Sequence, residues 1–257
     1  MKCCRMKTKA NWLSTVVALL LLPGPAWTQA TEQADSTRSA FDSRYIRVDH
    51  QITPDPTVAD FVAPYQQDLV RVMSDRLTTA PEVMEVGQPE TSLGNLAADI
   101  LREEAEKAHG APVDIALMNH RGLRIPLPEG DITVGTIFEL MPFENYMSLL
   151  KFTGEQLQSI ADELAIYGGE PISGMRMVID GNKGRDITVG GEPVDPERTY
   201  WLVTNEWMAN GGGEVPTLWS PLERIDLPVL IRDAFIEHLR EVDQIEPVLD
   251  GRMAIKE

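Results

Sequence analysis

The stretch YMSLLKFTGEQLQSIADELA, residues 146–165, contains the signals for a β-strand, a helix start and a helix in direct succession. Residues 146–152 form a mostly apolar run, which predicts a strand. Thr153 and Gln156 have the spacing of a capping box, in which each side chain satisfies a backbone N–H at the start of a helix. The helix that follows places Leu157, Ile160 and Leu164 on one face. This unit predicts a sheet with helices packed against it.

Outside this unit the chain mixes helical and strand patterns without the regular alternation of βαβ units. Pro228 is typical of a first helical position and predicts that the last helix begins there. We therefore expect an α+β fold, a single domain in which a mixed sheet carries packed helices. The other helices are predicted at residues 57–77, 92–108 and 133–140, and the other strands at residues 113–118, 175–179, 187–189 and 200–204.

The N-terminus has the pattern of an export signal. Four basic residues precede an apolar run at residues 12–22, and this run is too short to cross a bilayer core of roughly 30 Å. We expect a signal peptide at residues 1–30, a solvated leader at 31–43 and the folded domain at 44–257. The alternative is an uncleaved anchor. Cleavage predicts a periplasmic or secreted chain with no stable membrane span, and it removes Cys3 and Cys4, the only cysteines.

The charge balance excludes one class of partner. The chain carries 40 acidic and 23 basic residues, which gives a net charge of −17. Loss of the four basic residues of the signal peptide brings the net charge to about −21. Because such a chain repels polyanions, we expect no nucleic-acid polymer as a partner.

Three loops are candidate sites. Arg121 and Arg124 lie in the loop NHRGLR, residues 119–124, and guanidinium groups suit carboxylate or phosphate oxygens. The alternative is that both pair with surface carboxylates. Phe143 and Trp207 each lie in a turn-forming stretch, MPFEN at 141–145 and NEWMANGGG at 205–213, which can present a ring at a cleft. For these rings the alternative is a place in the core.

The order of seven short motifs resembles the C-terminal domain of the 5′-nucleotidase family, over roughly residues 45–235. The motifs are LGNL at 93–96, the loop at 119–124, DIT at 131–133, PFEN at 142–145, FTG at 152–154, ISG at 172–174 and WMANGG at 207–212.

The resemblance implies a nucleoside-recognition domain in which two aromatic rings enclose the base. By position in the motifs, Phe143 and Trp207 are the two faces of this sandwich. Asn119 and Arg124 are loop contacts to the ligand, Asn145 is a polar neighbour, and Gly174 lines the same pocket. Trp207 stands where the family usually has Phe, which preserves a stacking surface.

The sequence departs from the family pattern at three places. His120 and Arg121 replace two glycines of the loop, and no arginine precedes the LGNL motif within residues 82–88. Gly213 stands where an Asp usually contacts the ribose, so a sugar contact depends on Glu214 or on Arg121. Two stacked faces contribute roughly 2–6 kcal/mol, whereas micromolar binding needs about 8. We therefore expect weak or altered ligand specificity.

In this family a separate domain cleaves the phosphate ester with two metal ions, an arrangement that activates water and holds the phosphoryl oxygens. The four histidines of this chain are isolated in sequence, and no nucleophile with a base is recognisable, so we expect no catalytic residue and no cofactor in this chain.

One hypothesis is the substrate-binding half of a split 5′-nucleotidase. It would be completed by a separately encoded metallophosphoesterase that carries the divalent metals, with helix 57–77 as the connector. The alternatives are a non-catalytic exported binding protein for nucleosides or related aromatic ligands and, third, an enzyme that acts alone.

Overall fold

The computed structural model describes residues 47–49 and 51–256. The predicted signal peptide and leader lie outside the described residues. The chain divides into two units, Met1–Thr53 and Pro54–Glu257. In the first unit, the described residues form a turn in which the Ile52 amide donates to the Asp49 carbonyl at 3.1 Å. Among the helices of the described segments, none is long and apolar enough to cross a membrane.

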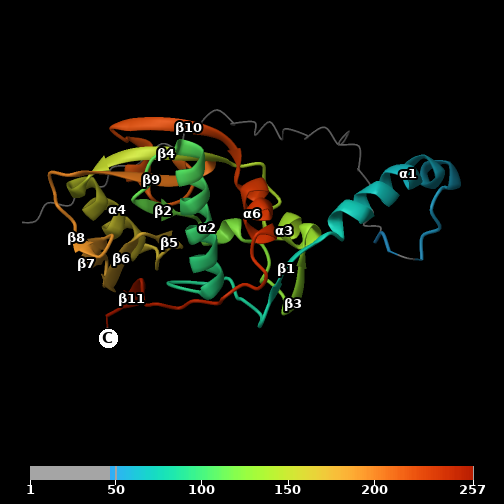
Figure 1. Ribbon diagram of the computed structural model, residues 1–257, viewed down its shortest axis with the longest axis horizontal. Helices are drawn as coiled ribbons and strands as arrows, with labels where there is room; N and C mark the ends of the chain where they lie inside the picture. Colours follow the sequence, from blue (N-terminus) through green and yellow to red (C-terminus); the bar gives the residue numbers. More distant parts are fainter. Residues whose placement is uncertain (1–46, 50, 257) are drawn as a thin grey trace, which may run out of the picture. The chain divides into compact units, whose positions relative to one another are not determined.

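A five-stranded mixed sheet forms the centre of the second unit (Figure 1). β4 (Tyr146–Thr153) lies antiparallel to both of its neighbours, β9 (Thr199–Asn205) and β10 (Glu223–Leu230), whereas β2 (Ile115–Leu117) lies parallel to β9 and antiparallel to β5 (Ile172–Ser173). The expected α+β class with a mixed sheet is therefore confirmed. The strand order is β10 (Glu223–Leu230), β4 (Tyr146–Thr153), β9 (Thr199–Asn205), β2 (Ile115–Leu117) and β5 (Ile172–Ser173).

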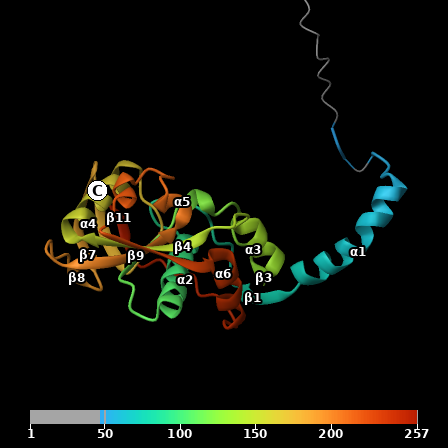
Figure 2. The same cartoon turned by 90° about the horizontal axis from the view of Figure 1, so that it is seen from above.

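This sheet separates two hydrophobic cores. Successive strand residues point to opposite faces, and along β4 Leu149 belongs to one core while Leu150 and Phe152 belong to the other. The first core lies under α2 (Ser92–His109), α3 (Val134–Leu140) and α6 (Ile231–Arg240), together with the small sheet of β1 (Arg76–Ala80) and β3 (Gly130–Thr133). Figure 2 shows α2 and α6 beside the sheet.

The second core lies between the five-stranded sheet, α4 (Gly154–Ile166) and a four-stranded sheet. It includes Leu157, Ile160 and Leu164 of α4, the three residues that the sequence placed on the inner face. The four-stranded sheet has the order β11 (Met253–Ile255), β6 (Met175–Asp180), β7 (Lys183–Val189) and β8 (Glu192–Pro193).

Local sequence signals place several helix starts correctly. The Thr153 hydroxyl accepts from the Gln156 amide at 3.2 Å, and the Gln156 side chain accepts from the Thr153 amide at 3.0 Å, so the predicted capping box is confirmed. Thr133 caps α3 in the same way, with Thr136 as its partner.

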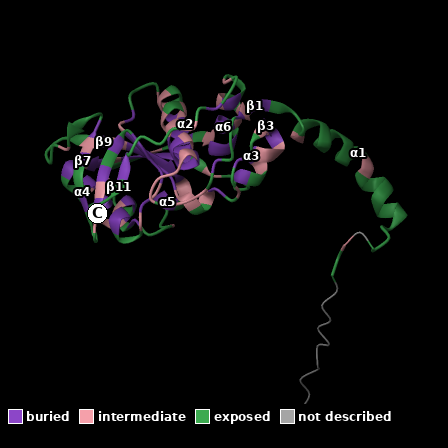
Figure 3. Cartoon of the chain, turned by 90° about the horizontal axis from the view of Figure 1, so that it is seen from below, coloured by how far each residue is buried: buried purple, intermediate pink, exposed green. Residues whose placement is uncertain are grey.

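The helix predicted for residues 57–77 is shorter than expected. α1 spans Pro56–Met73, and Leu77 lies instead in β1, where its side chain is buried. Thr78 and Thr79 follow, and β-branched residues favour a strand. None of the α1 side chains is buried, and Figure 3 draws most of the helix as exposed. Its apolar residues are therefore available for a contact that the described residues do not make.

The prediction that the last helix begins at Pro228 is wrong. β10 continues through Pro228 to Leu230, and α6 begins at Ile231. Proline is tolerated in a strand at a sheet edge or a bulge, because there its missing N–H breaks no ladder hydrogen bond. β10 is an edge strand, and its register against β4 shifts between Leu227 and Leu230. This longer strand places the N-terminus of α6 beside Asn145, whose carbonyl accepts from the Ile231 amide at 2.9 Å.

Candidate functional site

The loop of residues 119–124 follows β2, an interior strand of the sheet, and forms the short 3-10 helix η1 (His120–Gly122). Glu170 holds this loop. One of its carboxylate oxygens, Oε2, accepts from the His120 amide at 2.6 Å and lies 2.8 Å from Nδ1 of the His120 ring. Burial raises the pKa of Glu170, against the smaller opposing effects of His120 and Arg121. His120, which replaces a family glycine, thus anchors the loop.

The two arginines of the loop do not pair with surface carboxylates. Both are exposed, and within the described part of the chain neither has a carboxylate oxygen within 4.0 Å. The guanidinium carbon of Arg124 lies 5.9 Å from the centre of the Phe143 ring, within reach of a cation–π interaction. Two exposed positive groups therefore remain available in a strongly acidic protein, and that of Arg124 lies beside an aromatic ring.

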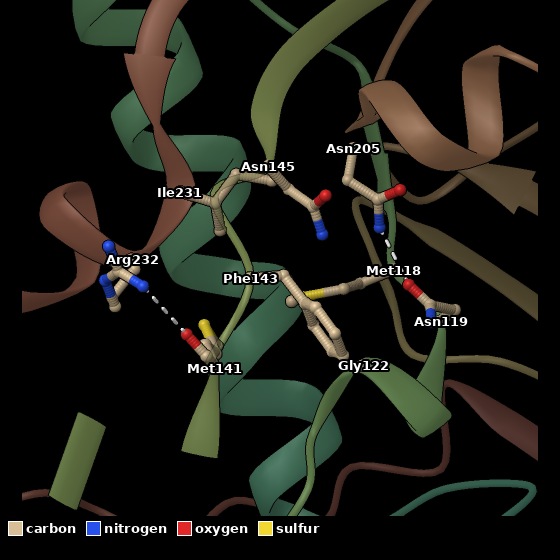
Figure 4. Close-up of a pocket in the computed structure, with 9 residues that line it drawn as sticks. All are labelled: Met118, Asn119, Gly122, Met141, Phe143, Asn145, Asn205, Ile231 and Arg232. Carbon is tan, nitrogen blue, oxygen red and sulfur yellow. Dashed lines mark hydrogen bonds between the residues drawn. The ribbon is translucent and has the colours of Figure 1, made fainter. Parts of the chain in front are cut away.

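Phe143 and Asn145 lie in the connection between α3 and β4. Phe143 is 46% exposed, which excludes a core role for its ring. The side-chain amide of Asn145 makes no hydrogen bond within the described residues, and in Figure 4 it points into the space between Phe143 and Asn205. An unpaired amide can both donate to and accept from a ligand.

Trp207 lies on the short helix α5 (Glu206–Ala209) and is 49% exposed. A Cβ built on Gly212 would lie 2.2 Å from Cδ2 and 2.3 Å from Cε2 of the indole. These two atoms join the fused rings and have no free direction in the ring plane, so Gly212 lies over one face of the indole. The backbone of this glycine supports that face, while the residue as a whole remains half exposed.

Asn205 connects the Trp207 helix to the loop. Its side-chain oxygen accepts from the Met208 amide at 2.8 Å and caps α5, while its side-chain nitrogen donates to the Asn119 side-chain oxygen at 2.7 Å. Asn205 is 1% exposed. The sequence did not single it out, although asparagine is a preferred cap and here lies two residues before Trp207.

These residues surround a narrow pocket (Figure 4). The centre of a water-sized sphere can reach about 10 Å³ of it, a volume that holds about one water molecule. The pocket is therefore too small to enclose an aromatic ring system, and a larger group could only lie at its mouth. The lining residues are Met118, Asn119, Gly122, Met141, Phe143, Asn145, Asn205, Ile231 and Arg232.

The expected site residues do not all line this pocket. Asn119, Phe143 and Asn145 do, whereas Trp207 is connected to it through Asn205 and Arg124 through Phe143. Gly174 lines a second cavity, beside Arg102, Ser173 and Arg252. A Cβ on Gly174 would lie 2.0 Å from the Asp114 carbonyl oxygen, and its φ is +74°. Gly174 thus permits a close approach of two backbone segments.

The donor set of the described residues does not fit a metal centre. No group of three or more His, Cys, Asp or Glu side chains gathers within residues 47–49 and 51–256 in a way that could hold an ion.

The fold and these motifs identify the family. Residues 73–219 match the model of the 5′-nucleotidase, C-terminal domain. The chain belongs to this family. A solved structure of a 5′-nucleotidase precursor from Thermus thermophilus is 26% identical, with a TM-score of 0.67, over 79% of this chain and 44% of that chain. The NAD nucleotidase of Haemophilus influenzae shares the fold, with a TM-score of 0.64 at 15% identity, over 78% of this chain and 41% of that one.

This chain is also similar to parts of longer proteins. The endonuclease YhcR of Bacillus subtilis (strain 168) is 30% identical over 172 residues, which are 63% of this chain and 14% of that protein. A 5′-nucleotidase of Vibrio parahaemolyticus is 25% identical over 189 residues, which are 68% of this chain and 32% of that protein. The chain thus spans about a third or less of the length of these relatives.

Proposed function

We propose that this domain recognises a nucleoside or nucleotide by stacking its base between Phe143 and Trp207, as the nucleotide-binding half of a split 5′-nucleotidase. A separately encoded metallophosphoesterase would supply the divalent metals and cleave the phosphate ester. The observation that carries the proposal is the Trp207 indole, which has one face supported by Gly212 while the side chain remains 49% exposed. A half-exposed aromatic ring on a fixed support is a ready stacking surface for a base.

The polar groups around the rings suit a nucleotide. Asn145 can bind the base edge, and the exposed guanidinium groups of Arg121 and Arg124 can meet a phosphate. At a net charge of −17, the protein as a whole repels an anionic ligand, so these two arginines provide the local attraction. The same rings contribute roughly 2–6 kcal/mol, which favours weak binding.

The exposed side of α1 supports the proposal of a partner. Phe61, Tyr65 and Leu69 are 71%, 68% and 54% exposed and follow one another at helical spacing. An exposed apolar stripe of this kind is typical of an interaction surface. We propose that the partner metallophosphoesterase contacts this stripe.

Export is the remaining part of the proposal. The pattern of residues 1–30 supports cleavage of a signal peptide and a periplasmic or secreted location. N-terminal sequencing of the protein from a membrane-free extracellular or periplasmic fraction tests it, and a retained residue 1 would contradict it.

The test of function combines the chain from residue 31 onward with a candidate metallophosphoesterase, AMP and a divalent cation. We expect no phosphate release by the chain alone, complex formation, and turnover only in the mixture. Phe61→Ser with Tyr65→Ser should abolish complex formation, whereas Leu249→Ser, at a site that is 68% exposed elsewhere, should not. Robust turnover by the chain alone would contradict the split enzyme. Nucleoside binding without any partner-dependent turnover would favour the exported binding protein.

A further inference from the structure

Arg232 is a buried cation at the pocket that the proposed function does not use. It is the second residue of α6 and is only 8% exposed. Its Nε has no hydrogen-bond partner among the described residues, and its Nη1 reaches only the Met141 carbonyl at 3.5 Å. Within the described chain no carboxylate lies within 4.0 Å of it. A buried charge without a charged partner is costly, and only one long hydrogen bond, to the Met141 carbonyl, offsets that cost here.

The packing of Arg232 keeps this guanidinium in place. Its Cζ lies 4.1 Å from the centre of the Phe138 ring, a close cation–π contact. Arg232 lines the same pocket as Phe143 and Asn145, and Figure 4 shows its guanidinium directed towards Met141 at the pocket wall. The side chain is thus held at the pocket without being neutralised there.

The N-terminus of α6 adds further donors at the same point. Leu230 precedes the helix and provides no side-chain cap. The amides of Arg232 and Asp233 lie in the first helical turn, where backbone N–H groups have no acceptor within the helix. A helix N-terminus of this kind favours an oxygen that carries negative charge. Asp233 also brings an exposed carboxylate to this turn, but within the described residues that carboxylate lies more than 4.0 Å from the guanidinium nitrogens of Arg232. The buried guanidinium therefore keeps donors without a charged acceptor in direct contact.

The size of the pocket limits the group that these donors can bind. The space available holds about one water molecule, so it admits one oxygen atom and excludes a phosphate group. A base stacked at the mouth would present its edge to this space. Guanidinium groups only donate, and an arginine next to the O6 of a purine is a favourable pairing. The exocyclic amine of adenine is itself a donor. It would therefore meet the donors of Arg232 and leave the buried guanidinium without an acceptor.

We propose that Arg232 makes this domain selective for bases with an exocyclic keto oxygen, such as hypoxanthine and guanine, over bases with an amine at that position. The inference rests on the proposed function, because it assumes that a base stacks at Phe143. In it, Arg232 is a specificity-determining residue.

Calorimetric titration with inosine, adenosine and purine riboside tests the proposal, because these nucleosides differ at position 6 of the base. We expect the wild-type chain to bind inosine at least about fivefold more tightly than either of the others. Arg232→Met retains an apolar stem against Phe138 and should reduce this preference to less than twofold. Arg240→Met changes an exposed arginine of the same helix and should leave the preference intact.

The possible results distinguish the selectivity for a keto oxygen from nucleoside recognition itself. Equal binding of the three nucleosides by the wild-type chain would overturn the keto selectivity while leaving nucleoside recognition in place. A preference that survives in a folded Arg232→Met variant would overturn the role of Arg232. If that variant does not fold, the wild-type comparison of inosine with purine riboside decides the question. No binding of any nucleoside at millimolar concentration would instead contradict the proposed function.

Discussion

Replacing Gly212 by alanine should displace the Trp207 indole and weaken nucleoside binding. The new Cβ would lie 2.2 Å from Cδ2 and 2.6 Å from the Trp207 carbonyl oxygen, whereas ordinary contacts begin at 3.4 Å. The ring must therefore move by about 1.2 Å or turn away from its support, and the backbone between Trp207 and Gly212 must shift as well. Loss of one stacking face costs about 1–3 kcal/mol, so affinity should fall roughly 5- to 150-fold.

The assay is calorimetric titration of inosine into the wild-type chain and the Gly212→Ala variant. Because the new Cβ also meets the Trp207 backbone carbonyl oxygen, we expect the midpoint of thermal unfolding to fall, and both proteins are titrated at a temperature where they are fully folded. Gly211→Ala is a control in the same loop, since its Cβ would meet nothing within 4 Å while its φ of +102° imposes backbone strain. If strain alone weakened binding, this control would show the larger loss.

A double variant isolates the indole as the cause. In a Trp207→Ala background there is no ring to displace, so adding Gly212→Ala should change affinity less than twofold. Unchanged inosine affinity in a folded Gly212→Ala single variant would refute the reasoning that this glycine supports a stacking face.

Three further predictions concern stability. Asn205→Ala should lower the free energy of unfolding by about 1–3 kcal/mol in urea denaturation, because it removes the cap of α5 and leaves the Asn119 side-chain oxygen without its donor. A loss below about 0.5 kcal/mol would contradict the role of Asn205 as the link between α5 and the loop. Thr153→Ala should cost about 1 kcal/mol in the same assay through loss of its cap, and no change would contradict that role. The hydrogen bonds from Arg252 lower the pKa of Asp250 below 3.8, so its contribution is complete above pH 3.8 and is lost as the pH falls towards the folded-state pKa. The stability difference between wild type and Asp250→Asn should therefore shrink between pH 5 and pH 2.5, and a difference that grows would contradict the assignment.

Local signals predicted the parts of the fold that depend on a few neighbouring residues. The capping box at Thr153 and Gln156 and the inner face of α4 follow from hydrogen bonding and periodicity within one turn or two. Pro228 shows the limit of this reasoning. Its fixed φ suits both a helix start and an edge strand, and only the pairing of β10 with β4 decides between them.

The candidate site likewise contains residues that local motifs predict and residues that only long-range contacts reveal. Phe143, Asn145 and Trp207 were recognisable from motifs, and Phe143 and Trp207 proved to be half exposed. Arg232 and Asn205 were not recognisable, because their importance comes from contacts with segments about 90 residues away in sequence. The sequence placed Gly174 in the pocket, but its motif could not reveal the close approach of the Asp114 carbonyl.

The most direct test of the central claim is the affinity of inosine for the chain from residue 31 onward, measured by calorimetry for wild type, Phe143→Ala and Trp207→Ala. If the two rings enclose the base, each substitution should weaken binding roughly 5- to 150-fold while the protein remains folded. Binding that is unchanged in both variants would contradict recognition of a base by this pair of aromatic side chains.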